Sequence, residues 1–345
     1  MSADKLAIGI VGAGRIGKVH ADTIAFTLPQ ARLVSITDVD RGAAQSLADR
    51  CAIPSVAASS DDLLSDARVE AVLICSSTDT HARLIGEAAR AGKHIFCEKP
   101  IAHDLPGIDA ALEAVSKAGV KLQIGFNRRF DANFARVRRA VETDEIGQPR
   151  LLHIVSRDPA PPPISYIKGS GGIFLDMTIH DFDMARFLIG DEVEEIFVSG
   201  GTMVDPAIGA AGDLDTAVIV LRFRSGVIGT IENCRQAAYG YDQRVEILGS
   251  LGKIAAENCY PNQVVVSTGT EVRRDLPLNF FMDRYRESFA AELRAFVDAV
   301  INDQPTPVNG LDGRMPVVMG LAARKSCELG RPVRLTEVGQ AVRPA

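Results

Sequence analysis

The stretch that decides the fold is Leu6-Ala7-Ile8-Gly9-Ile10-Val11, followed at once by Gly12-Ala13-Gly14-Arg15-Ile16-Gly17. The first six residues have the pattern of a buried β-strand, and a helical pattern follows the glycines over residues 18–26. A G-x-G-x-x-G motif is weak alone, but between a strand and a helix it predicts a dinucleotide-binding turn. Its glycines allow a tight turn, a close approach of the backbone to a pyrophosphate, and close packing of helix on strand. We therefore assign cofactor binding to Gly12, Gly14, Arg15, Ile16 and Gly17.

An acidic residue follows the next strand pattern, which covers residues 32–37. Asp38 lies 21 positions after Gly17 (38 minus 17), close to the roughly 20 expected of the acid that binds an adenosine ribose. A carboxylate there would repel a 2'-phosphate, and the nearest cation along the chain is Arg41. We expect NAD rather than NADP as the cofactor; the alternative is a glycine turn that binds nothing.

Strand and helix patterns then alternate up to residue 126. The strand patterns cover residues 71–75, 94–97 and 121–126, and the helical ones cover 43–50, 79–90 and 105–117. Such alternation predicts a parallel, doubly wound sheet, whose ligands bind beyond the carboxyl ends of the strands. Two segments fall there, residues 76–81 and Glu98-Lys99-Pro100. From them we assign Ser76, Thr78, His81, Glu98 and Lys99 to the cofactor site.

Lys99 is also a candidate for the reaction itself. It follows a strand directly and precedes a proline, which favours an extended backbone. Its ammonium group would then lie where the nicotinamide is expected, where it could bind a substrate oxygen and stabilise an alkoxide. The alternative is an ordinary solvated surface charge.

A second candidate group follows Gly171-Gly172. The apolar pattern there predicts one continuous helix, on which Asp176, His180 and Asp183 are spaced i, i+4 and i+7 and so share a face. A carboxylate one turn from an imidazole can orient it and raise its basicity, as removal of a proton from an alcohol requires. A surface polar pair is the simplest alternative. A metal site is another, but no further ligand lies nearby in a recognised spacing, so we expect no metal.

The composition limits the classes of protein. The 345 residues fit two domains, which we place at 1–125, binding NAD, and 126–345, binding substrate and forming oligomers. A net charge of -6 without a basic block argues against nucleic acid. No apolar run approaches the roughly 18 residues of a membrane span, and none resembles a secretion signal. Six scattered cysteines without paired spacing suggest reduced thiols and a cytoplasmic protein.

The second half has a different pattern. A helix is predicted at 133–142, a proline-rich connection at 158–164, and closing helices at 284–300 and 310–328. Between them lie strand patterns at residues 150–155, 194–200, 216–223, 227–234, 243–248 and 264–267. They predict an α+β domain with a large, mostly antiparallel open sheet and helices on one face. The other face would carry Ile219, Leu221, Val227, Gly229, Ile231 and Val245. An apolar surface of that size predicts a homo-oligomer, dimer or tetramer, unless that face simply meets water.

Three motifs together resemble one known family. The glycine turn, Glu98-Lys99-Pro100, and Gly171-Gly172 followed by Asp176 and His180 resemble the glucose-fructose oxidoreductase/inositol dehydrogenase/rhizopine catabolism (Gfo/Idh/MocA) family. The resemblance covers nearly the whole chain. It implies an NAD(P)-dependent sugar or polyol dehydrogenase in which Lys99, Asp176 and His180 are catalytic. Residues 125–131, 156–159 and 239–244 are most similar to inositol 2-dehydrogenases.

The expected reaction is oxidation of a ring alcohol, most simply of myo-inositol to 2-keto-myo-inositol with NAD. Each buried hydroxyl of a polyol needs a partner, which we assign to residues from both halves: Lys99, Arg129, Asp158, Asp176, His180, Asp183 and Tyr239. Two alternatives remain. One is a dehydrogenase for scyllo-inositol or for an aldose such as glucose. The other is a silent NAD-binding sensor, which should lack one of the three catalytic residues.

Overall fold

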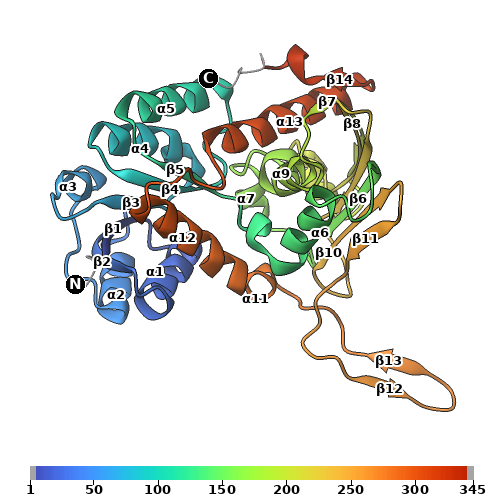
Figure 1. Cartoon of the computed structure of the whole chain (residues 1–345), viewed down its shortest axis with the longest axis horizontal. Coiled ribbons are helices and arrows are strands. Elements are labelled where there is room, and N and C mark those ends of the chain that lie inside the picture. The colour runs from blue at the N-terminus through green and yellow to red at the C-terminus, as the bar shows by residue number, and fades with distance from the viewer. Residues whose placement is uncertain (1–4, 340–345) are drawn as a thin grey trace. The chain divides into compact units, whose positions relative to one another are not determined.

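The chain divides into two compact units (Figure 1). A computed structural model describes residues 5–339; the first unit contains residues 5–130 and 287–317, and the second contains 131–286 and 318–339. The sequence prediction drew one boundary after residue 125. The structure instead places segment 287–317 with the first unit, because its apolar side chains complete the core of the first sheet.

The first unit is built on a parallel sheet. Its five strands stand in the order β2-β1-β3-β4-β5. Their bounds are β1 (Leu6–Val11), β2 (Ala31–Thr37), β3 (Ala71–Ile74), β4 (His94–Glu98) and β5 (Leu122–Gly125). All six residues of β1 are buried, as expected of the central strand of a sheet covered on both faces. The predicted doubly wound sheet is confirmed.

Helices cover both faces of this sheet. One core contains side chains of α1 (Arg15–Thr27), α2 (Arg41–Cys51) and α12 (Arg286–Ile301) together with those of the strands. On α12 these are Leu293, Phe296 and Val297. Figure 1 shows α4 (Thr78–Arg90) and α5 (Leu105–Ala118) packed together on the other face. Helix α3 (Ser60–Ser65) lies between α2 and β3 along the chain.

The second unit contains the larger sheet. Its strand order is β11-β10-β6-β9-β8-β7-β14, in which β6 and β9 are parallel and the other neighbours antiparallel. The bounds are β6 (Pro149–Arg157), β7 (Val193–Gly201), β8 (Thr216–Phe223), β9 (Ile228–Cys234), β10 (Asp242–Gly249), β11 (Lys253–Ala256) and β14 (Val333–Arg334). Helix α9 (Thr178–Ile189) packs on β6 and β9 and against α6 (Ala132–Glu142). The predicted mostly antiparallel sheet is confirmed.

The segment after the two glycines forms two helices, where the sequence predicted one. Gly171 and Gly172 both have positive φ, and a Cβ on Gly172 would lie 2.7 Å from an Asp213 oxygen. Helix α8 (Ile173–Asp176) follows them, and Met177 separates it from α9. The remaining helical segments of the described chain are α7 (Ile164–Ile167), α10 (Pro206–Ala210), α11 (Phe281–Arg284), α13 (Gly310–Leu329), η1 (Asn127–Phe130) and η2 (Leu335–Glu337).

The sequence prediction chose the wrong residues for the open face of the large sheet. Ile219, Leu221, Val227, Ile231 and Val245 are all buried in the single chain. Those of them that belong to strands point toward the side of the sheet that α9 covers. The open face carries the alternate positions, among them the exposed Leu151, Phe197, Val218, Val220, Ile228 and Leu248.

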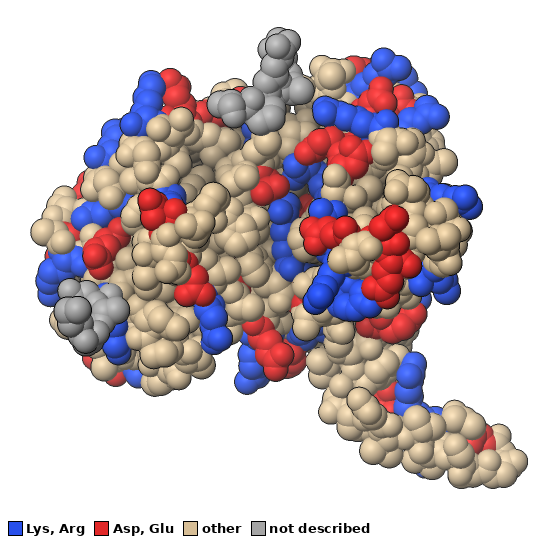
Figure 2. Space-filling model, viewed as in Figure 1, with Lys and Arg blue, Asp and Glu red and all other residues tan. Residues whose placement is uncertain are grey.

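Residues 264–267 do not join the large sheet, contrary to the sequence prediction. Strand β12 (Val265–Ser267) pairs with β13 (Val272–Arg274) in a separate hairpin whose strand residues are all exposed. Figure 1 shows this hairpin extending away from the large sheet, and Figure 2 shows mostly uncharged residues on it.

Two further observations concern the surface and the thiols. Figure 2 shows acidic and basic side chains interspersed over the visible face, and all six cysteines are free. Within residues 5–339, no helix is both long and apolar enough to cross a membrane.

Candidate active site

The glycine turn between β1 and α1 has the geometry that its motif predicts. Gly12 has a φ of +108°, and a Cβ there would lie 2.6 Å from the Cys75 carbonyl group. A Cβ on Gly17 would lie 2.1 Å from the Gly12 oxygen, so the helix packs too closely on the turn for any side chain. Beside Gly14, the N-cap of α1, no heavy atom lies within 4 Å of a Cβ position. The helix N-terminus therefore faces open space and fits the pyrophosphate of a dinucleotide.

Asp38 lies beside this turn, at the carboxyl end of β2. One of its carboxylate oxygens accepts a hydrogen bond of 2.6 Å from the backbone N–H of Ala13, and the other accepts one of 2.8 Å from that of Asp40. Both bonds fix the carboxylate next to the glycines. This is the place in which an acid would meet the adenosine ribose.

The predicted segments after β3 and β4 are joined by a histidine. The ring of His81, which is buried, lies with Nδ1 2.8 Å from the Pro100 carbonyl oxygen and Nε2 3.1 Å from that of Ser76. The hydroxyl of Ser76 is 2.6 Å from that of Thr80 in the first turn of α4, which Thr78 begins. His81 thus holds the two loops together, and Lys99, which precedes Pro100 through a cis peptide bond, is half-buried.

Two other predicted residues of the first unit are held by partners. The Glu98 carboxyl group points into the core, with Oε1 2.6 Å from Nε2 of the buried His20. Arg129 donates a hydrogen bond of 3.0 Å to Asp312. Sequence reasoning missed His20, whose position inside α1 gives no sign of a partner 78 residues away.

In the second unit, α8 and α9 leave two of the predicted side chains accessible. From Ile173 to Arg186 the helices are buried except at Asp176 and His180, which are half-buried. The predicted acid and base are therefore the polar groups that reach the surface from an otherwise buried segment. Asp183 is fully buried and does not share their accessibility.

Tyr166 and Arg235 hold the Asp176 carboxylate. The Tyr166 hydroxyl donates a hydrogen bond of 2.9 Å to Oδ1, and the Arg235 guanidinium donates one of 3.2 Å to Oδ2. Arg235 is 1% exposed and also lies 3.5 Å from Asp213, which accepts a bond from the N–H of Ile173. The arginine fixes both carboxylates, Asp213 at the start of α8 and Asp176 at its end. Arg235 directly follows β9, and nothing in the sequence around it indicates that it contacts Asp176.

A buried polar network anchors α9 to the sheet. Thr178 donates a hydrogen bond of 2.6 Å to the side-chain oxygen of Asn233. The side-chain amide of Asn233 donates hydrogen bonds of 2.8 Å to Asp181 and 3.3 Å to the Ser156 carbonyl oxygen. All four residues are buried. The network fixes the first turn of α9, which carries His180.

Of the two remaining predicted substrate residues, Asp158 directly follows β6 and Tyr239 lies in the turn between β9 and β10. The N–H of Asp158 donates a hydrogen bond of 2.9 Å to the Cys234 carbonyl oxygen. The Tyr239 hydroxyl accepts a hydrogen bond of 2.7 Å from Arg157 and donates one of 2.5 Å to Asp242. Burial and the Asp242 carboxylate raise the pKa of Tyr239, so its hydroxyl stays protonated. Arg157 and Asp242 are paired across β6 and β10, on the face opposite α9.

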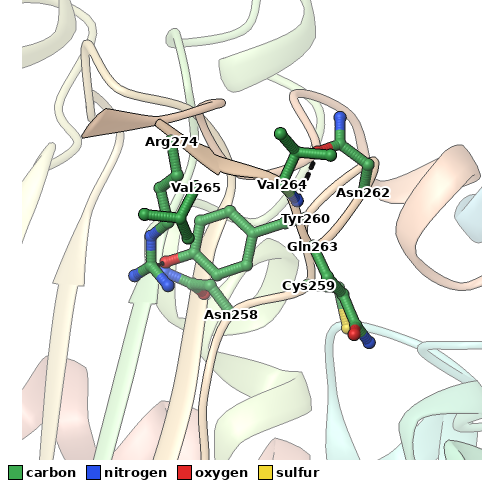
Figure 3. A pocket seen from close by; sticks show the side chains of 8 residues that line it. All are labelled: Asn258, Cys259, Tyr260, Asn262, Gln263, Val264, Val265 and Arg274. Atoms are coloured by element: carbon green, nitrogen blue, oxygen red, sulfur yellow. Dashed lines mark hydrogen bonds between the residues drawn. The ribbon is translucent and has the colours of Figure 1, made fainter. Parts of the chain in front are cut away.

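A pocket of about 380 Å³ lies at the base of the β12–β13 hairpin (Figure 3). There the Arg274 guanidinium stacks over the Tyr260 ring, and Asn258 lies beside them. None of the predicted site residues lines it. We assign it no part in the reaction.

Fold and site together define the class of protein. The glycine turn, the acid after β2 and the doubly wound sheet make the first unit a dinucleotide-binding Rossmann fold. Residues 6–126 match the model of an oxidoreductase family with an NAD-binding Rossmann fold, and residues 134–255 match that of the GFO/IDH/MocA C-terminal domain. The chain belongs to the GFO/IDH/MocA family of oxidoreductases.

Similar proteins cover almost the whole chain. A myo-inositol 2-dehydrogenase of Thermotoga maritima is 48% identical over 96% of this chain and 99% of its own length. The crystal structure of a myo-inositol dehydrogenase from Corynebacterium glutamicum is 38% identical, with a TM-score of 0.91 over 99% of this chain and 100% of that one. The crystal structure of scyllo-inositol dehydrogenase from Lactobacillus casei, with bound NAD(H) and scyllo-inositol, is 31% identical. Its TM-score is 0.91, over 96% of this chain and 100% of that one.

Proposed function

We propose that the protein is an NAD-dependent dehydrogenase that oxidises myo-inositol to 2-keto-myo-inositol. The observation that carries the proposal is the pair Asp176 and His180, the accessible side chains of an otherwise buried helical segment. The glycine turn with Asp38 supports a dinucleotide cofactor. The similarity to inositol dehydrogenases supports the choice of substrate.

His180 removes the proton of the ring hydroxyl in the proposed reaction. An imidazole is the side chain most often used as a general base in proteins. Tyr166 and Arg235 fix the carboxylate of Asp176, which orients the imidazole and stabilises it when it gains the proton. NAD, when bound, supplies the acceptor for the hydride.

Lys99 binds the same oxygen and stabilises its developing negative charge in this proposal. Asp158, Asp183, Arg129 and Tyr239 would bind the other hydroxyls. Tyr239 would do so with a hydroxyl that already contacts Arg157 and Asp242.

A substrate panel tests the proposal. Purified protein is mixed with NAD or NADP and with myo-inositol, scyllo-inositol or glucose, and formation of the reduced cofactor is followed by absorbance. We expect the highest kcat/KM for myo-inositol with NAD. A higher value for scyllo-inositol would establish the second candidate, which the Lactobacillus casei structure favours. Tight NAD binding without turnover of any polyol would contradict both.

The proposal extends to assembly and location. We infer a cytoplasmic homotetramer that acts in polyol and sugar metabolism. The exposed apolar residues of the open sheet face support burial against another copy of the chain, and the six free thiols suit a reducing compartment. Light scattering on the native protein and on Val218→Glu tests the assembly: a monomeric native protein would contradict it.

A further inference from the structure

Three ionisable side chains meet inside the first unit. They are His20 on α1, Glu98 at the end of β4 and Glu292 on α12 (Figure 1). All three are buried, and one nitrogen or oxygen atom of each lies within 4.8 Å of those of the other two. The cluster therefore joins two helices to the strand that leads into Lys99.

The surroundings of the cluster are apolar. The His20 ring contacts Phe96 and Phe289 edge to face, with centroids 5.1 and 6.0 Å apart. Its Nε2 lies 2.6 Å from Oε1 of Glu98, so one proton binds the two groups together. In such a medium an uncompensated charge is expensive.

Glu292 brings a second carboxyl group to this pair. Both of its oxygens are buried, and among the described residues neither has a hydrogen-bond partner. Burial and the neighbouring Glu98 raise the pKa of Glu292 well above its usual value. Burial likewise raises the pKa values of the nearby thiols of Cys75 and Cys97, which stay neutral.

The polar neighbour on β5 does not neutralise the carboxyl group. Gln123 donates its hydrogen bond of 2.8 Å to the backbone oxygen of Glu292. If Glu98 and Glu292 were both ionised, the cluster would carry a net negative charge even with His20 protonated. Two titratable protons, one between His20 and Glu98 and one on Glu292, remove that charge.

We propose that His20, Glu98 and Glu292 form an electrically neutral cluster that fixes the carboxyl end of β4 and thereby positions Lys99. Only the consequence for Lys99 rests on the proposed function. Glu98 has little room to move: it pairs with Gly125 of β5, where a Cβ would lie 3.0 Å from the Glu98 carboxyl carbon. His20 holds the carboxyl group from the other end, and Lys99 follows Glu98 directly. His20 and Glu292 are thus positioning residues.

The protonation of Glu292 is tested by thermal unfolding of the native protein and Glu292→Gln between pH 5 and 8. A native carboxyl group that keeps its proton while the unfolded chain releases it destabilises the fold progressively as pH rises. Glutamine is neutral at every pH, so the difference in Tm, variant minus native, should grow by about 3 °C for each pH unit. Glu287→Gln makes the same change at an exposed site of α12 and should show no such trend.

Two outcomes of this experiment would overturn the cluster. A difference that does not change with pH would mean that Glu292 does not hold a proton. A loss of stability in Glu292→Gln that grows as pH rises would mean that an ionised Glu292 is stabilised in the fold by a bound cation. Elemental analysis of the purified protein would then identify a metal ion on the same three side chains.

The positioning role is tested at His20. Phenylalanine keeps a ring but removes the donor to Glu98, whereas glutamine places a donor near the position of Nε2. We expect His20→Phe to lower kcat about tenfold or more, with NADH binding by fluorescence within about twofold of native, and His20→Gln to recover most of the loss. An unchanged kcat, or an equal loss of NADH binding, would refute the role. If the native protein oxidised no polyol, the proposed function would fail, and the unfolding experiment would still decide the cluster.

Discussion

Replacement of Arg235 by methionine tests how the two ends of α8 are held. The side chain is 1% exposed, and its guanidinium lies 3.2 Å from Asp176 and 3.5 Å from Asp213. Methionine fills much of the volume but leaves two carboxylates, 14% and 11% exposed, without their cation. Loss of one partner of a buried pair costs about 3–5 kcal/mol. We expect the lower end, about 3 kcal/mol, because Tyr166 and the N–H of Ile173 still donate to the two acids.

The assay combines urea unfolding with steady-state kinetics. Besides its lower free energy of unfolding, Arg235→Met should show a kcat at least about tenfold below native, because Asp176 loses its orientation. Arg235→Lys keeps the charge and should recover part of both losses. Arg224→Met makes the same change at an exposed position and should change neither quantity. A loss below about 1 kcal/mol with an unchanged kcat would refute the reasoning.

Three further predictions concern the cofactor and pH. Gly17→Ala forces a Cβ to within 2.1 Å of the Gly12 oxygen, so calorimetry should show at least a tenfold loss of NAD affinity; native affinity would contradict the packing argument. Asp38→Ser removes the carboxylate that would repel a 2'-phosphate. The ratio of kcat/KM with NAD to kcat/KM with NADP should therefore fall about tenfold or more. An unchanged ratio would mean that Asp38 does not determine the choice of cofactor. Burial alone would raise the pKa of Asp215, but three backbone N–H donors and a hydroxyl lower it. The ionised carboxylate therefore stabilises the fold above the unfolded pKa of about 3.9. This stabilisation is lost as pH falls through the lower pKa of the folded protein. Asp215→Asn should therefore be less stable than native by about 2 kcal/mol at pH 7, with a difference that shrinks below about pH 4; a constant difference would exclude the carboxylate as its source.

Local patterns were sufficient to predict the first unit. The strand from Leu6 to Val11, the glycines after it and the acid at position 38 are close in sequence, and each has a conformational reason to be where it is. The alternation of strand and helix then leaves little choice of topology. The same locality predicted the spacing of Asp176 and His180, although the break at Met177 divides the expected helix.

Contacts between distant segments were not predictable in this way. Residues 217–221 read Ala-Val-Ile-Val-Leu, so both faces of β8 are apolar and the sequence cannot indicate which of Val218 and Ile219 faces the helices. The partners Arg235 and His20 lie 59 and 78 residues from the carboxylates that they hold. The packing of α12 on the first sheet likewise joins segments about 200 to 290 residues apart.

The most direct test of the account measures the oxidation of myo-inositol with NAD by the native protein and by His180→Ala, with the product identified by NMR. His94→Ala serves as the matched control, since it removes an imidazole at the amino end of β4, the end opposite Lys99. The account predicts 2-keto-myo-inositol from the native and control proteins. It also predicts that kcat falls at least about a hundredfold in His180→Ala while NADH binding is kept. A His180→Ala protein that turns over at the native rate would contradict the assignment of the base.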